Sequence, residues 1–138
     1  MSAKFEIADN TVEEIAERLV EKFSKKFLHI NLQDVYFAFK DSQKSKWRAQ
    51  TSLIKGVLSS FTKKKVAVTI WKQHWVTSDE VERMLILYHE FLHLIYDDDK
   101  KNYVMVRHDI ENFREMLMDF GIDEEKAKQV FGTLEGTK

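Results

Sequence analysis

The stretch MLILYHEFLHLIY, residues 84–96, decides both the expected fold and the candidate site. No Gly or Pro interrupts this stretch, so it predicts a helix, and residues 89–93 within it have the pattern HExxH. On a helix, residues four apart lie one above the other, so His89 and His93 can bind one metal ion. Glu90 lies one position further round the helix, where its carboxylate can take a proton from a metal-activated water. The pattern therefore predicts a zinc-dependent peptidase.

The apolar surroundings of the HExxH pattern favour a metal site over a coincidental surface pattern. Buried helices seldom carry two histidines and a glutamate within five residues, because unpaired polar groups cost several kcal/mol in an apolar setting. A metal ion that binds both imidazoles removes this cost. We therefore interpret His89, Glu90 and His93 as parts of one site.

Length and composition predict a single domain that spans residues 1–138. A chain of this size can bury about two thirds of its unfolded surface. It contains no cysteine, so any metal must be bound by histidine and carboxylate ligands, which are more typical of catalytic than of structural zinc. No secretory segment opens the chain, and no apolar run reaches the roughly 18 residues that span a bilayer. We therefore expect a cytoplasmic protein without a membrane partner.

The formal net charge is only −1, but positive charge is concentrated in the middle of the chain. Residues 40–76 contain nine basic residues and one acid, Asp41, so the rest of the chain carries −9. Such a segment could contact nucleic acid or an acidic substrate. We favour a solvated face with lysines that protect an edge strand, because the aromatic residues among them fit core packing equally well. The basic residues are Lys40, Lys44, Lys46, Arg48, Lys55, Lys63, Lys64, Lys65 and Lys72.

Hydrophobic periodicity predicts an α+β domain with a short mixed sheet. Period-two alternation predicts strands at 33–40 and 65–71, with a further strand near 47–52. Helical spacing predicts helices at 11–27, 77–96, 106–120 and 123–131, with Thr11 and Thr77 as N-caps. The helix at 77–96 should pack across the sheet, with further helices following it. Its expected core stripe consists of Val81, Met84, Leu85, Tyr88, Leu92 and Ile95.

A catalytic zinc usually takes three protein ligands and keeps one position for water. His108, 15 residues after His93, is the best candidate for the third ligand, because the next helix can return alongside the first. Asp97, Asp109 and Glu111 are the alternatives, and His74 is a weaker one.

Other polar residues near the motif have less specific roles. Asp97 could instead orient His93, although a role as a plain loop acid fits it better. His29 and His74 are expected to be structural or exposed. An oxyanion could be stabilised by Tyr96, Tyr103, Arg107 or the zinc ion itself.

Two stretches of the sequence carry a resemblance to a known family. LYHEFLH at residues 87–93, followed by an acidic and basic loop and by VRHDIENF at 106–113, resembles the putative phage metallopeptidase family. These are small zincin-like proteins of phages, prophages and bacteria, and the resemblance covers about residues 30–120. It implies a zincin-like α+β fold, zinc bound by His89, His93 and His108, and Glu90 as general base.

Three hypotheses for the function follow. The leading one is a single-domain zinc metallopeptidase that acts on a protein or peptide substrate. The second is a non-catalytic zincin scaffold that binds or regulates a partner. The third is a DNA-associated, SprT-like protease whose basic segment 40–76 docks nucleic acid.

Overall fold

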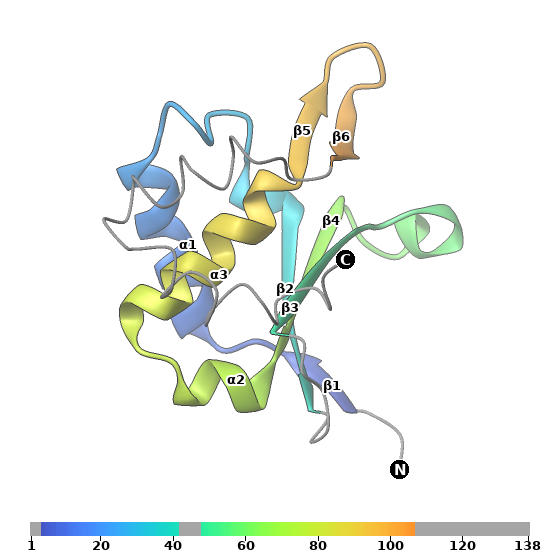
Figure 1. The fold of residues 1–138 in the computed structure, drawn as a ribbon. Helices are drawn as coiled ribbons and strands as arrows, with labels where there is room; N and C mark the ends of the chain where they lie inside the picture. Colours follow the sequence, from blue (N-terminus) through green and yellow to red (C-terminus); the bar gives the residue numbers. More distant parts are fainter. Residues whose placement is uncertain (1–3, 42–47, 107–138) are drawn as a thin grey trace.

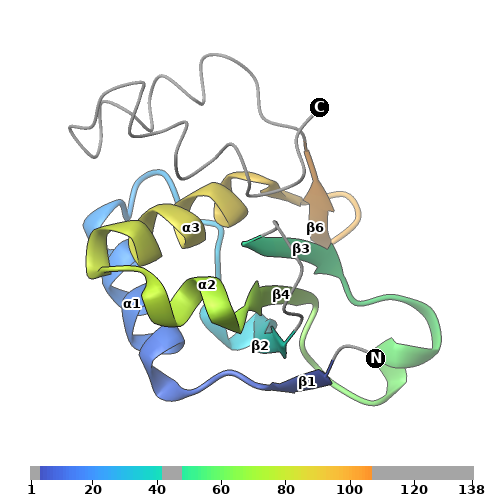
Figure 2. The ribbon, with the colours of Figure 1, turned by 60° about the horizontal axis from the view of Figure 1, so that its bottom comes forward.

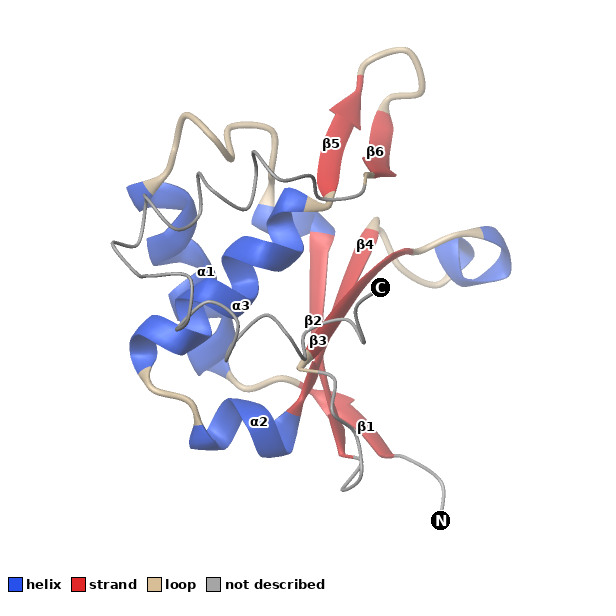
Figure 3. Cartoon of the chain, in the orientation of Figure 1, coloured by secondary structure: helices blue, strands red, loops and turns tan. Residues whose placement is uncertain are grey.

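The domain is built on a four-stranded mixed sheet, with α1 and α3 on one side of it (Figure 1). The computed structural model describes residues 4–41 and 48–106. The strand order is β1-β2-β4-β3, and β5 and β6 form a separate hairpin (Figure 3). This architecture confirms the α+β class. In chain order the elements are β1 (Lys4–Ile7), α1 (Asn10–Lys22), β2 (Val35–Asp41), β3 (Ala49–Leu53), β4 (Val66–Trp71), α2 (Lys72–Thr77), α3 (Glu80–Leu92), β5 (Leu94–Asp97) and β6 (Asn102–Met105), with short 3₁₀ turns at Leu32–Asp34 and Gly56–Ser60.

Alternating burial sets the face of the sheet that meets the helices. Val66, Val68 and Ile70 of β4 are completely buried, whereas the residues between them are partly exposed. β2 runs parallel to β4, and β3 pairs with the other side of β4 in antiparallel fashion. The predicted strands at 33–40, near 47–52 and at 65–71 are therefore confirmed within a few residues. The edge strand β1 was not predicted, because its four residues are mixed and partly polar.

Helix α1 confirms the prediction of a helix after residue 10, although its ends differ. Asp9, not Thr11, is the N-cap, because the Asp9 carboxylate accepts a hydrogen bond from the Thr11 backbone N–H. The helix ends at Lys22 instead of Phe27. Its buried face consists of Val12, Ile15, Ala16 and Leu19, which have the spacing of one side of a helix.

The helix that carries the HExxH motif starts later than predicted. Residues 72–77 form the separate short helix α2, and α3 begins at Glu80. Asp79 is the N-cap, and its carboxylate and the Glu82 side chain form a reciprocal capping box with the opposite backbone N–H groups. The predicted N-cap at Thr77 is therefore wrong by two residues.

The same helix ends earlier than predicted, at Leu92 instead of Tyr96. Ile95 and Tyr96 belong to β5, where they pair with Val104 and Tyr103 of β6. β-branched and aromatic residues favour a strand, and cross-strand pairing satisfies their backbone groups as a helix would. The Tyr96 and Tyr103 rings meet edge to face, with centroids 5.4 Å apart.

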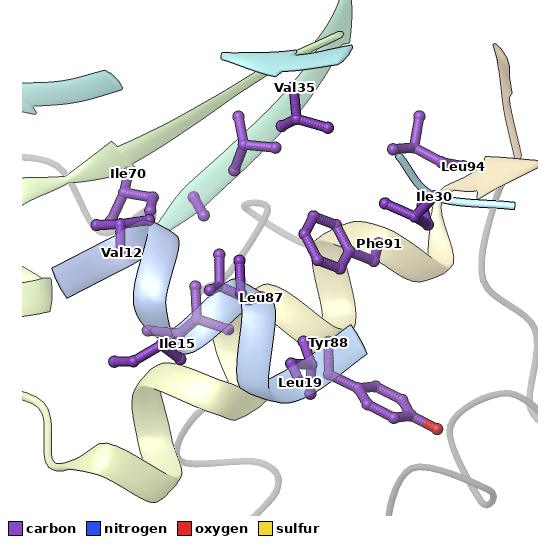
Figure 4. Close-up of a cluster of buried hydrophobic side chains, with 14 of the residues drawn as sticks. Val12, Ile15, Leu19, Ile30, Val35, Ile70, Leu87, Tyr88, Phe91 and Leu94 are labelled. Atoms are coloured by element: carbon purple, nitrogen blue, oxygen red, sulfur yellow. The ribbon is translucent and has the colours of Figure 1, made fainter. Parts of the chain in front are cut away.

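The second half of α3 is buried on every side. Each residue of 85–91 is at most 9% exposed, which a one-sided apolar stripe would not produce. The predicted core stripe is correct for Leu85 and Tyr88 but wrong for Val81 and Ile95, which are 48% and 45% exposed. Figure 4 shows Leu87 and Phe91 within the cluster of buried hydrophobic side chains. The two polar residues in this buried stretch are His89 and Glu90. Val106 is described and is not helical, whereas the rest of the predicted helix at 106–120 and the predicted helix at 123–131 lie outside the described residues.

Tyr103 anchors the β5–β6 hairpin to the segment before β2. Its hydroxyl donates a hydrogen bond to Asp34 and accepts one from the Asn31 backbone N–H, at 3.0 and 3.1 Å. Burial raises the pKa of the Tyr103 hydroxyl to about 12, and the hydrogen bond to Asp34 acts in the same direction. The hairpin is thereby held against the body of the domain.

We expect the free energy of unfolding to fall less steeply between about pH 10 and pH 12 in Tyr103→Phe than in the wild type. An unfolded tyrosine loses its proton near pH 10, whereas Tyr103 keeps it until about pH 12 in the folded state. Its contribution to the free energy of unfolding is therefore present below pH 10 and is lost as the pH rises towards 12. Denaturant unfolding across this range should show a smaller decline in Tyr103→Phe than in the wild type. The control is Tyr96→Phe on the same hairpin, and an equal decline in Tyr103→Phe and the wild type would contradict this assignment.

Candidate metal centre

The three motif residues lie together at the C-terminal end of α3. His89 and Glu90 are in its last turn, and His93 is the C-cap, with φ −72° and ψ −13°. This backbone conformation continues the helical turn. His93 therefore still lies one turn after His89 on the same side of the helix, although the helix ends at Leu92. Their ring centroids are 5.3 Å apart, and one potential ligand atom from each of the three residues lies within 4.8 Å of the others. The structure thus brings together the cluster predicted from the sequence.

Glu90 is a completely buried carboxylate. The Thr51 hydroxyl, from β3, donates a hydrogen bond of 2.6 Å to its Oε1 atom. Its Oε2 atom lies 3.5 Å from Nδ1 of His89 and accepts no hydrogen bond from the residues that the structure describes. A buried carboxylate oxygen without a partner costs several kcal/mol. A cation bound by the neighbouring histidines would offset this cost, so the residues present fit a metal ion.

The backbone of Val106 holds the His93 side chain. Nδ1 of His93 lies 2.8 Å from the Val106 carbonyl oxygen, and the Val106 N–H donates a 2.7 Å hydrogen bond to the His93 carbonyl. Because a carbonyl can only accept, we assign the imidazole proton to Nδ1, which leaves the lone pair of Nε2 for a metal. The β5–β6 hairpin returns the chain to this position, next to β3 (Figure 2).

The other residues singled out in the sequence divide into two groups. Asp97 is the last residue of β5, and its carboxylate accepts hydrogen bonds from the Asp99 and Lys100 N–H groups of the hairpin turn. It therefore acts as a loop acid and does not orient His93. His74 is on α2 outside the cluster, and His29 contacts the Leu94 carbonyl oxygen at 2.8 Å. The remaining candidates, His108, Asp109, Glu111 and Arg107, lie outside the described residues.

The two tyrosines considered for oxyanion stabilisation line a cavity of about 640 Å³ that none of the three cluster residues lines. The Tyr103 hydroxyl is already engaged with Asp34 and Asn31. This cavity therefore lies beside the hydrogen bonds that hold the hairpin and is not lined by the cluster. We assign neither tyrosine to the cluster.

Two contributors to the site were missed in the sequence. Thr51 follows Ala49 on the buried face of β3, so a hydroxyl at a core-facing position was the available signal. The Val106 carbonyl gave no signal, because any residue supplies a carbonyl and only the hairpin brings this one to His93.

A comparison with protein families gives a match over nearly the whole chain. A family model described as "Putative phage metallopeptidase" matches residues 3–135, nearly the whole chain. No curated protein and no solved structure matches the chain.

We expect the purified chain to bind one zinc ion and to lose it in His93→Ala. Metal bound only by the folded state raises stability, by about 2.7 kcal/mol at a free zinc concentration one hundred times Kd. Elemental analysis and thermal unfolding with and without chelator measure both effects. His74→Ala, a histidine outside the cluster, should keep the ion. Equal zinc in His93→Ala and the wild type would place the binding site elsewhere.

Proposed function

The chain belongs to the putative phage metallopeptidase family, and we propose that it hydrolyses peptide bonds at the site of His89, Glu90 and His93. The observation that carries this proposal is the buried Glu90 carboxylate between two histidines, with one oxygen held by Thr51 and the other without a hydrogen bond among the described residues. Buried, polarised carboxylates of this kind are typical of general acid–base sites. A surface motif that arose by chance would have no reason to be enclosed.

We assign zinc as the metal, with His89 and His93 as ligands. Imidazole nitrogens suit zinc, and a chain without cysteine can offer it only histidine and carboxylate ligands. Bound there, the ion would polarise the scissile carbonyl and lower the pKa of a water molecule. The Val106 carbonyl supports this role, because it engages Nδ1 of His93 and leaves Nε2 for a metal.

Glu90 is the general base of the proposed reaction. Thr51 occupies Oε1, so Oε2 is the oxygen that takes the proton from the attacking water. The same carboxyl group then gives that proton to the nitrogen of the leaving amine, which balances the hydrolysis. The buried position of Glu90 keeps bulk water from competing for this proton.

His108 is the proposed third ligand. It follows Val106 by two residues, and the Val106 backbone already contacts His93. Covalent geometry limits two residues to about 7 Å, so this connection supports His108. Asp109 and Glu111 remain alternatives, and metal content of His108→Ala, Asp109→Asn and Glu111→Gln side by side distinguishes the three. A zincin-like arrangement of the whole domain is part of this proposal.

Glu90→Gln should keep the metal and lose hydrolysis by a factor of about 10²–10⁴, the usual contribution of a general base. Glutamine has nearly the same shape but cannot accept the proton. The measurement is cleavage of unfolded protein and of a peptide library with zinc and with chelator. Glu82→Gln on the same helix is the matched control and should stay active, since its amide oxygen can still cap. Retained hydrolysis in Glu90→Gln would remove the assigned role, and an inactive, zinc-loaded wild type would favour a binding protein.

Thr51 is a positioning residue for Glu90, because its hydroxyl donates a hydrogen bond to the Glu90 carboxylate. Thr51→Val removes the hydroxyl with little change of shape, so it should lower kcat about tenfold without loss of bound zinc. Thr51→Ser keeps the hydroxyl and should restore most of the activity. If valine and serine lowered kcat equally, the effect would come from packing and not from the hydrogen bond.

A further inference from the structure

The connection between β3 and β4 carries an exposed apolar cluster on an ordered turn. Val57, Leu58 and Phe61, here named the apolar tip, are 78%, 66% and 79% exposed. The turn projects from the end of the β3–β4 pair, on the side of the sheet away from α1 and α3 (Figures 1 and 2). Exposed apolar groups gathered in this way usually mark an interaction site.

Hydrogen bonds within the turn fix its backbone, so the apolar tip is held in an exposed position by an ordered structure. The Ser59 and Ser60 hydroxyls donate hydrogen bonds to the Gly56 and Val57 carbonyl oxygens, at 2.7 and 2.6 Å. At the base, the Ile54 N–H donates a 2.9 Å hydrogen bond to the Lys65 carbonyl and extends the β3–β4 pairing. Gly56 has φ +63°, which a residue with a side chain rarely adopts.

The charge around the apolar tip is entirely positive along the sequence. No acidic residue occurs between Asp41 and Asp79, and Lys55 and Lys63 flank the tip as exposed side chains. Within the part of the chain that the structure describes, neither of these two lysines forms an ion pair. Other basic residues of the same segment are engaged: Lys64 donates to the Gln33 carbonyl, Lys72 pairs with Glu6, and Lys40 lies over the Phe5 and Trp71 rings. Among the described residues, Lys55 and Lys63 are thus exposed cations available next to the apolar tip.

We propose that the apolar tip and the flanking Lys55 and Lys63 dock the protein on an anionic lipid surface. Apolar side chains gain free energy when they leave water for the acyl region, and lysines beside them gain from anionic headgroups. A nucleic acid backbone would satisfy the lysines but would leave Val57 and Leu58 in water, so it fits the surface less well.

This contact requires no membrane-spanning segment, and among the described residues no helix is long and apolar enough to cross a bilayer. It departs from the expectation that the chain has no membrane partner, because span length says nothing about insertion of a turn. It also gives the basic segment a role other than the protection of an edge strand.

The apolar tip lies close along the chain to the candidate site. Gly56 follows Thr51 by five residues, which an extended chain covers in about 17 Å. A docked tip would therefore hold the cluster near the lipid surface. The docking itself does not depend on the proposed peptidase activity and would stand without it.

The test is co-sedimentation of the full chain with vesicles of phosphatidylcholine and with an equal mixture of phosphatidylcholine and phosphatidylglycerol. We expect binding to the anionic vesicles only. The double variant Leu58→Ser, Phe61→Ser should weaken it at least about tenfold, and Lys55→Gln or Lys63→Gln about fivefold each. The matched control Ile7→Ser, Leu28→Ser removes two side chains of similar exposure, 74% and 84%, from other surfaces and should bind as the wild type does.

Each contrary outcome is distinct. Absence of wild-type binding to anionic vesicles would overturn the proposal, as would unchanged binding in the Leu58→Ser, Phe61→Ser variant. Binding to duplex DNA that needs Lys55 and Lys63 but not the apolar tip, without vesicle binding, would assign the surface to nucleic acid instead. Self-association lost in the apolar variant, again without vesicle binding, would assign it to a second copy of the chain. Thermal unfolding of every variant establishes that it is folded.

Discussion

Enclosure of the second half of α3 is the constraint on which the rest of the structure depends. Residues 85–91 are buried on all sides, so a polar atom among them is costly unless it has a partner inside the domain. Tyr88 packs edge to face against Phe27, which attaches the helix to the chain after α1. Glu90 reaches the Thr51 hydroxyl across to β3, which attaches it to the sheet. The candidate site is therefore part of the core, and its position is as rigid as the packing around it.

The early end of α3 has a functional consequence. A helix continued to Tyr96 would have carried the chain away from His93. The hairpin of β5 and β6 instead returns it, so the Val106 carbonyl meets the His93 imidazole and selects the nitrogen that carries the proton. Tyr103 holds this hairpin through Asp34 and Asn31, so a residue remote from the motif supports the geometry of one of its histidines.

The basic segment is less uniform in the structure than in the sequence. Lys40, Lys64 and Lys72 make contacts within the domain, whereas Lys55 and Lys63 stand beside three exposed apolar side chains. A count of charges treats these lysines alike, but only the fold separates those that stabilise the domain from those that remain available to a partner. The combination of available charge and apolar surface is what distinguishes a lipid surface from a purely electrostatic partner.

The sequence by itself determined the α+β class, the strands at β2 and β4, helix α1 and the histidine–glutamate cluster. These features depend on spacing along one element, since period-two burial and the i, i+4 relation on a helix are local. The tertiary structure decided the partners of that cluster: Thr51 from a strand 39 residues earlier and Val106 from a hairpin 13 residues later. It also decided where α3 ends, because pairing of Ile95 and Tyr96 with β6 competed successfully with the helix. Such contacts arise between segments distant in sequence, and the residue types involved, a threonine hydroxyl and a backbone carbonyl, are too common to indicate their partners in advance.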